Sequence, residues 1–114
     1  NYAFYRAMVD YKTGRYQAAL EAWEEQLRSN PSNDTLNYFA GSAFLALGEN
    51  DRALQYFEKV TAREGSVFFS DACWYIGLVL VKQHKTAEAV KWIGKSQHEG
   101  REDLLAQLQQ HGAP

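Results

Sequence analysis

The chain has 114 residues and a formal net charge of -2, which suits one globular domain with a sizeable apolar core. Its lysines and arginines form no block, which argues against the basic face that nucleic-acid binding requires. The single cysteine excludes an intrachain disulfide, and no apolar run approaches the ~20 residues that a membrane-spanning helix needs.

Apolar residues recur at helical spacing in six segments, and a seventh helical pattern closes the chain. We expect helices, in chain order, over Tyr2–Lys12, Tyr16–Ser29, Asp34–Leu47, Asp51–Arg63, Phe69–Lys82, Thr86–Gln97 and residues 101–111. Gly14 and Gly48 can adopt the left-handed conformation that ends a helix, and Pro31 cannot continue one. Asn50 and Thr86 stand where N-terminal caps are needed, so we expect them to cap the helices that follow.

The six helices form three pairs that share one pattern. A shift of 34 residues carries the first pair onto the second, and a shift of 36 carries the second onto the third. The matched positions hold a small residue in the first helix, a small residue in the second and then a large one: Ala7, Gly41 and Gly77; Ala19, Ala53 and Ala89; Trp23, Phe57 and Ile93. We expect the small residues to let paired helices approach closely, and the large ones to fill the space between neighbouring pairs.

Three stretches carry a family resemblance: YKTGRYQAALEAWEEQLRSNP, YFAGSAFLALGENDRALQYFEKV and DACWYIGLVLVKQHKTAEAVKWI. Over about residues 1–97 they resemble the tetratricopeptide repeat family. The resemblance implies an all-α fold, a right-handed α-solenoid of three helix-turn-helix repeats plus a C-terminal capping helix. We expect one domain over residues 1–114, with repeats at about 1–33, 34–67 and 68–99 and the capping helix at 100–112. His84 replaces the usual turn glycine, and Gln26 and Ser96 stand where the family usually has alanine.

The two ends of a solenoid need polar outer surfaces. Leu104, Leu105 and Leu108 form one apolar stripe on the last helix, which predicts a lid over the third repeat, with a partner-binding helix as the alternative. Arg6 and Asp10 occupy positions that are apolar in the later repeats, which fits a first repeat without a neighbour before it and leaves upstream repeats open.

The predicted binding face is taken from the family, in which the first helices line the concave surface and ligands usually lie there. The corresponding positions are Phe4, Met8 and Tyr11; Tyr38, Ser42 and Leu45; and Trp74, Leu78 and Val81. Steps of three or four place each set on one stripe of its helix. An apolar, aromatic groove suits an amphipathic helix or an extended hydrophobic segment, with Trp74 and Tyr38 as the expected anchors. Partial burial of this face, including cover by the C-terminal helix, is the alternative.

One subset of the family grips the C-terminal carboxylate of chaperone peptides with Lys, Asn and Arg. The matching positions here hold Phe4, Met8, Phe39, Asp71 and Tyr75. None of these is a cation, and an aspartate repels a carboxylate, so the sequence argues against that ligand.

Candidate chemistry is sparse in this sequence. His84, His98 and His111 are scattered without a ligand spacing, and Cys73 falls on the packing face of its helix, where a small buried residue is expected. We therefore expect no catalytic residue, no metal and no cofactor.

The leading hypothesis is a protein–protein interaction module that binds a hydrophobic or amphipathic polypeptide segment, with no nucleic-acid partner and no direct membrane insertion. The alternative is structural self-assembly, a homo-oligomer formed through the same surface. The chain begins at Asn1 without an initiator methionine, which indicates an excised domain or a processed form. The compartment stays open between cytoplasm and periplasm, and a longer, membrane-anchored parent chain is one interpretation.

Overall fold

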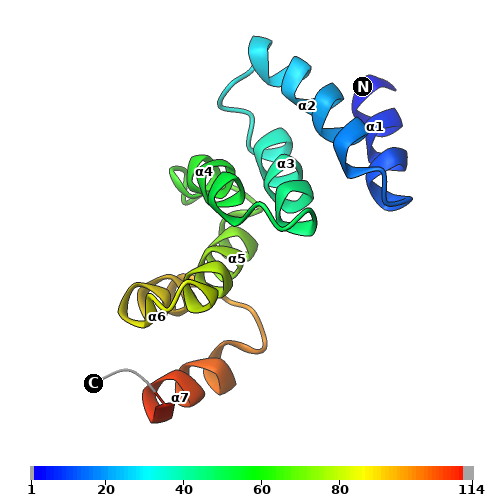
Figure 1. Cartoon of the computed structure of the whole chain (residues 1–114). Coiled ribbons are helices and arrows are strands. Elements are labelled where there is room, and N and C mark those ends of the chain that lie inside the picture. Colours follow the sequence, from blue (N-terminus) through cyan, green and yellow to red (C-terminus); the bar gives the residue numbers. More distant parts are fainter. Residues whose placement is uncertain (1, 112–114) are drawn as a thin grey trace. The chain divides into compact units, whose positions relative to one another are not determined.

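The computed structural model describes residues 2–111, which form seven α-helices joined by short loops (Figure 1). The chain divides into two compact units, Asn1–Val60 and Thr61–Pro114, and each is described here by itself. Within the described residues, none of the helices combines the length and the apolar character needed to cross a membrane.

The first unit holds two helix pairs. Its helices are α1 (Tyr2–Lys12), α2 (Tyr16–Ser29), α3 (Asp34–Ala46) and α4 (Asn50–Thr61), the last of which ends at the unit boundary. Helix α2 packs against both α1 and α3. Each of the expected helices is present, and the predicted bounds of α1 and α2 match the observed ones.

The second unit holds one helix pair and a further helix. Its helices are α5 (Phe69–Lys82), α6 (Thr86–Lys95) and α7 (Arg101–His111). Helix α5 packs against α6, and α6 also contacts α7. Helix α6 ends two residues earlier than the sequence pattern predicted, because Ser96 has an extended backbone.

The three helix pairs turn in the same way. Gly14 (φ +85°), Gly48 (φ +78°) and His84 (φ +62°) follow the first helix of each pair in the left-handed conformation. The amide of each donates to the carbonyl three residues back, and the next amide donates to the carbonyl five residues back, at 2.7–3.2 Å. These bonds satisfy the last carbonyls of the helix. His84 therefore has the turn role of the two glycines, although it carries a side chain.

The N-terminal caps of the helices agree less well with the sequence predictions than the turns do. Asn33 caps α3, because its side-chain oxygen accepts a hydrogen bond from the Leu36 amide at 2.9 Å. The predicted caps are wrong by one position: Asn50 is already the first residue of α4, and Lys85 precedes α6. Since Asn50 and Thr86 lie inside their helices, neither has the extended backbone that lets a cap side chain reach forward.

The small residue of the first helix meets the large residue of the second helix within the second and third pairs. Phe57 and Ile93 are fully buried. A Cβ built on Gly41 would stand 2.9 Å from Phe57 Cε1, and one built on Gly77 would overlap Ile93 Cγ1. Phe57 and Ile93 therefore each fill the place of a missing Cβ in their own pair. Trp23 agrees with the expectation of packing between neighbouring pairs, since its ring centroid lies 5.9 Å from that of Phe39 in the next pair.

Candidate functional site

All nine residues predicted to line the binding face lie on the first helices of the three pairs. Phe4, Met8 and Tyr11 are on α1, Tyr38, Ser42 and Leu45 are on α3, and Trp74, Leu78 and Val81 are on α5. Every one of them is partly exposed, neither in the core nor fully in solvent. Such side chains are held in place by packing on one side and can still present apolar surface on the other.

In the first unit, the stripe rests on a buried aromatic cluster. Trp23 of α2 is fully buried at its centre. Its ring centroid lies 5.9 Å from Phe4, 5.7 Å from Tyr11 and 5.9 Å from Phe39. The rings meet at tilted or edge-on angles, the arrangement that aromatic pairs favour. Trp23 thus holds the two α1 aromatics in fixed positions while leaving part of each at the surface.

Tyr38 continues the aromatic packing along α3. Its ring meets Phe39 edge-on at 5.2 Å and tilts against Phe57 at 5.9 Å. The neighbouring Ser42 hydroxyl donates to the Tyr38 carbonyl at 3.0 Å, one turn back on the same helix. Ser42 therefore directs its donor to its own helix, and the stripe on α3 is more apolar than its sequence suggests.

In the second unit, one face of Trp74 is covered by the chain itself. The His98 imidazole stacks on the indole with ring centroids 3.9 Å apart and planes within 5° of parallel. His98 belongs to the segment between α6 and α7, and was not among the residues that the sequence pattern singled out for the site. Leu78 and Val81 follow Trp74 on α5, and both stay partly exposed.

The positions that would form a carboxylate grip hold no cation. Phe4 and Phe39 pack against each other, edge-on, at 5.9 Å, so two of the five positions contribute to an aromatic contact instead. Asp71 is exposed near the start of α5. The side chains at these five positions therefore offer no charge-assisted hydrogen bond to an anionic ligand.

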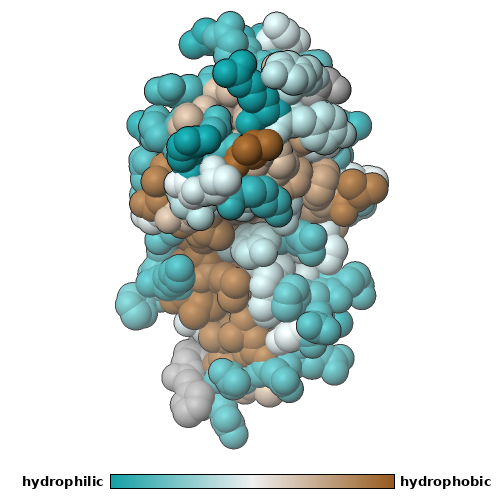
Figure 2. All heavy atoms as spheres, turned by 90° about the vertical axis from the view of Figure 1, so that its right-hand side faces the viewer, coloured by the Kyte–Doolittle hydropathy of each residue, from teal (hydrophilic) through white to brown (hydrophobic). Residues whose placement is uncertain are grey.

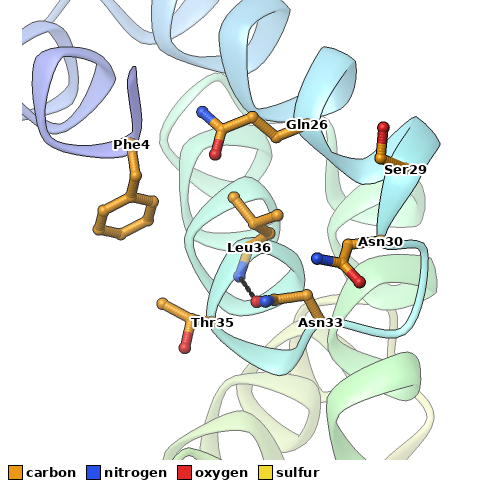
Figure 3. Close-up of a pocket in the computed structure, with 7 residues that line it drawn as sticks. All are labelled: Phe4, Gln26, Ser29, Asn30, Asn33, Thr35 and Leu36. Atoms are coloured by element: carbon orange, nitrogen blue, oxygen red, sulfur yellow. Dashed lines mark hydrogen bonds between the residues drawn. The ribbon is translucent and has the colours of Figure 1, made fainter. Parts of the chain in front are cut away.

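A hollow of about 350 Å³ opens beside Phe4 in the first unit (Figure 3). It is lined by Phe4, Gln26, Ser29, Asn30, Asn33, Thr35 and Leu36, none of which is charged. Figure 3 shows Gln26 and Ser29 reaching it from α2, and Thr35 and Leu36 from the start of α3. The sequence pattern did not predict this hollow, although Gln26 stands out in it as a departure from the usual alanine.

Hydrophobic side chains also lie outside the predicted stripes. Figure 2 shows hydrophobic side chains at the surface of the face that it presents, with hydrophilic ones around them. On α1, Tyr2 is 80% exposed, Tyr5 65% and Val9 59%. Their helical spacing is visible in the sequence, where the charged Arg6 and Asp10 beside them favoured the interpretation of a polar end.

Reactive side chains are few in residues 2–111. That part of the chain has no group of three or more His, Cys, Asp or Glu residues placed to hold a metal ion. Cys73 is fully buried on α5, and this burial raises the pKa of its thiol. The reactive thiolate therefore forms less readily than in an exposed cysteine. Tyr56 of α4 donates a hydrogen bond to Glu24 of α2 at 3.0 Å.

Comparison with known proteins agrees with the geometry. The chain is similar to the solved structure "First TPR of Spaghetti (RPAP3) bound to HSP90 peptide SRMEEVD", with a TM-score of 0.82 and 18% sequence identity, over 95% of this chain and 88% of that chain. At this identity the likeness shows the fold. No curated protein sequence matches. The family model for the tetratricopeptide repeat matches twice, over residues 6–67 and 41–100. These matches together span most of the sequence, and the chain therefore belongs to the tetratricopeptide repeat family.

Proposed function

We propose that the chain is a protein-interaction module that binds a hydrophobic or amphipathic polypeptide segment through the partly exposed residues of its first helices, and that it catalyses no reaction. The observation that carries the proposal is the shared exposure of the nine stripe residues, eight of which are apolar or aromatic. Stiff aromatic rings that are fixed by packing lose little conformational freedom on binding, which favours them as anchors.

The hollow beside Phe4 supports the same function in the first unit. Its apolar lining residues, Phe4 and Leu36, can contact a hydrophobic side chain, while the amides and hydroxyls around them can bond to a peptide backbone. A bound segment that crosses the α1 stripe could place one uncharged side chain there.

The ligand proposed here differs from the HSP90 peptide SRMEEVD bound in the similar structure, which ends in Glu-Val-Asp. The positions that match that carboxylate grip hold Phe4, Met8, Phe39, Asp71 and Tyr75, none of which is a cation. We therefore expect the SRMEEVD peptide to bind this chain no more tightly than its C-terminally amidated form does.

The test begins with peptides selected on the chain from a random display library. Tyr38→Ala and Trp74→Ala are each expected to lower the affinity for the selected peptides about thirtyfold or more. This is the loss typical of an aromatic anchor that contributes about 2 kcal/mol to binding. Tyr2→Ala and Trp92→Ala are matched controls, because they remove the same ring types outside the stripes. Equal losses in all four variants, or none in the stripe variants, would refute the assignment. Thermal unfolding followed by circular dichroism checks that each variant folds.

Self-assembly through the same residues is the second candidate, and it is supported by the same exposed apolar side chains. Self-assembly predicts that the molar mass measured by light scattering rises with protein concentration. In the Tyr38→Ala variant the molar mass should stay at the monomer value. A constant monomer mass would remove this candidate and leave the peptide-binding proposal intact.

A further inference from the structure

The imidazole of His98 stacks closely on the indole of Trp74. The two ring planes are nearly parallel, and the centroids are 3.9 Å apart. Gly100 lies against the same indole, since a Cβ built on it would stand 3.3 Å from Trp74 Cη2. The segment His98–Gly100 therefore covers one face and one edge of a residue that belongs to the α5 stripe.

This segment is tethered to α5 through a site separate from the stack. The Ser96 hydroxyl donates to the Ser70 carbonyl at 3.0 Å, and the Gln97 amide donates to the Ser70 hydroxyl at 2.7 Å. The buried Ser96, which replaces the usual alanine of the repeat, thus fixes the chain just before His98. The tether brings the imidazole next to Trp74 without depending on it.

The imidazole itself is held lightly. Its Nδ1 accepts a hydrogen bond from the Gly100 amide at 2.9 Å, which places the ring proton of the neutral form on Nε2. Within residues 2–111, no hydrogen bond joins the imidazole to α5, and stacking is its contact with that helix. Rotation about the His98 side-chain bonds would uncover the indole while the bonds to Ser70 stay in place.

We infer that this face of Trp74 is a subsite for a planar ring side chain of the bound polypeptide, and that His98 occupies it as an intramolecular competitor which the partner displaces. The inference rests on the proposed function, and adds both the chemistry of one ligand side chain and a built-in limit on affinity. The geometry specifies the ligand: a flat ring that lies parallel to the indole, next to the apolar Leu78. A stacking contact of ordinary strength changes an equilibrium constant by about two- to tenfold, which sets the size of the competition.

Two variants separate the ring of His98 from its hydrogen bond. His98→Asn removes the ring and keeps an acceptor, Oδ1, at the place of Nδ1. His98→Phe keeps a flat ring and loses the acceptor. The probe is a display-selected peptide that contains one aromatic or histidine residue and whose binding to the whole chain requires Leu78, on the same helix as Trp74. It is compared with the same peptide carrying alanine in place of that ring residue.

Under the inference, the ring-bearing peptide binds His98→Asn about two- to tenfold more tightly than it binds the unmodified chain, and His98→Phe about as tightly as the unmodified chain. The alanine peptide gains less from His98→Asn than the ring-bearing one does. Adding Trp74→Leu removes the gain. Gln97→Ala is the control, because its side chain is exposed and immediately precedes His98 in the same loop.

An unchanged or weaker affinity in His98→Asn, or a gain that survives Trp74→Leu, would overturn the inference. A purely structural role for the segment predicts the reverse order, with His98→Asn neutral and His98→Phe altered. Failure of the proposed function looks different, because then no selected peptide depends on Tyr38 or Trp74 at all.

Discussion

Ile93 of α6 lies directly over the Cα of Gly77 on α5, where a Cβ would overlap Ile93 Cγ1 and stand 3.4 Å from the Ile93 backbone nitrogen. Gly77→Ala should therefore destabilise the chain, although alanine is the better helix former by about 1 kcal/mol. Overpacking against a fully buried, β-branched side chain costs about 1–3 kcal/mol, and we expect the upper part of that range. Urea unfolding followed by circular dichroism measures the change.

Gly94→Ala is the matched control for this prediction. Gly94 follows Ile93 in α6, but a Cβ there meets nothing within 4 Å, so Gly94→Ala should raise the free energy of unfolding by about 0.5–1 kcal/mol. The double variant Gly77→Ala with Ile93→Ala should lose less free energy of unfolding than the sum of the losses in the two single variants. Strict additivity would mean that Gly77 and Ile93 are not coupled.

His84→Gly should raise the free energy of unfolding by about 1 kcal/mol. The backbone of His84 has φ +62°, a conformation that costs a residue with a Cβ about 1–2 kcal/mol and costs glycine little. Thermal and urea unfolding would both report the gain. Gly48→Ala, at the same place in the preceding pair, should show a loss, and a loss in His84→Gly as well would contradict the argument from backbone strain.

Asn33→Ala should cost about 1 kcal/mol of stability, because it removes the acceptor that caps the Leu36 amide at the start of α3. Asn50→Ala is the comparison, since Asn50 lies inside α4 and should tolerate alanine with little change. Chemical denaturation of the two variants side by side tests the difference. Equal losses would mean that the cap bond contributes nothing measurable.

Asn33 and Asn50 also show which features of the fold could be predicted from the sequence. Helical spacing located the helices because one buried face repeats every three or four residues, and the glycine registers located the turns. Helical spacing did not identify the N-terminal caps. Asn33 and Asn50 both precede a helical pattern, and only the backbone conformation decides which of them lies outside the helix. For the candidate site, spacing grouped the nine stripe residues on three helices. It gave no sign of the His98 stack, which depends on the path of a loop.

Tyr56 should titrate well above an ordinary tyrosine. Burial, together with the hydrogen bond to Glu24 and its negative charge, raises the pKa of Tyr56 to about 12. Because the folded-state pKa lies above the unfolded value near 10, this group contributes stability that is fully present below pH ~10 and is lost as the pH rises toward 12. Difference absorbance of tyrosinate, with Tyr56→Phe subtracted, isolates the transition.

Glu24→Gln should lower that pKa, since the amide still accepts a hydrogen bond but no longer repels the phenolate. The pKa should stay above 10, because burial is the largest cause of the shift. A transition at the same pH in both proteins would show that the Glu24 charge has no influence on Tyr56.

The distribution of the tryptophans gives each unit its own optical signal. Trp23 is fully buried within Asn1–Val60, whereas Trp74 and Trp92 belong to Thr61–Pro114. Replacing one set by phenylalanine leaves emission from one unit, so denaturant titrations of the two variants follow the halves of the chain separately. Coincident midpoints would define a single cooperative system, and separate midpoints would make each half an autonomous foldon whose opening has its own free energy.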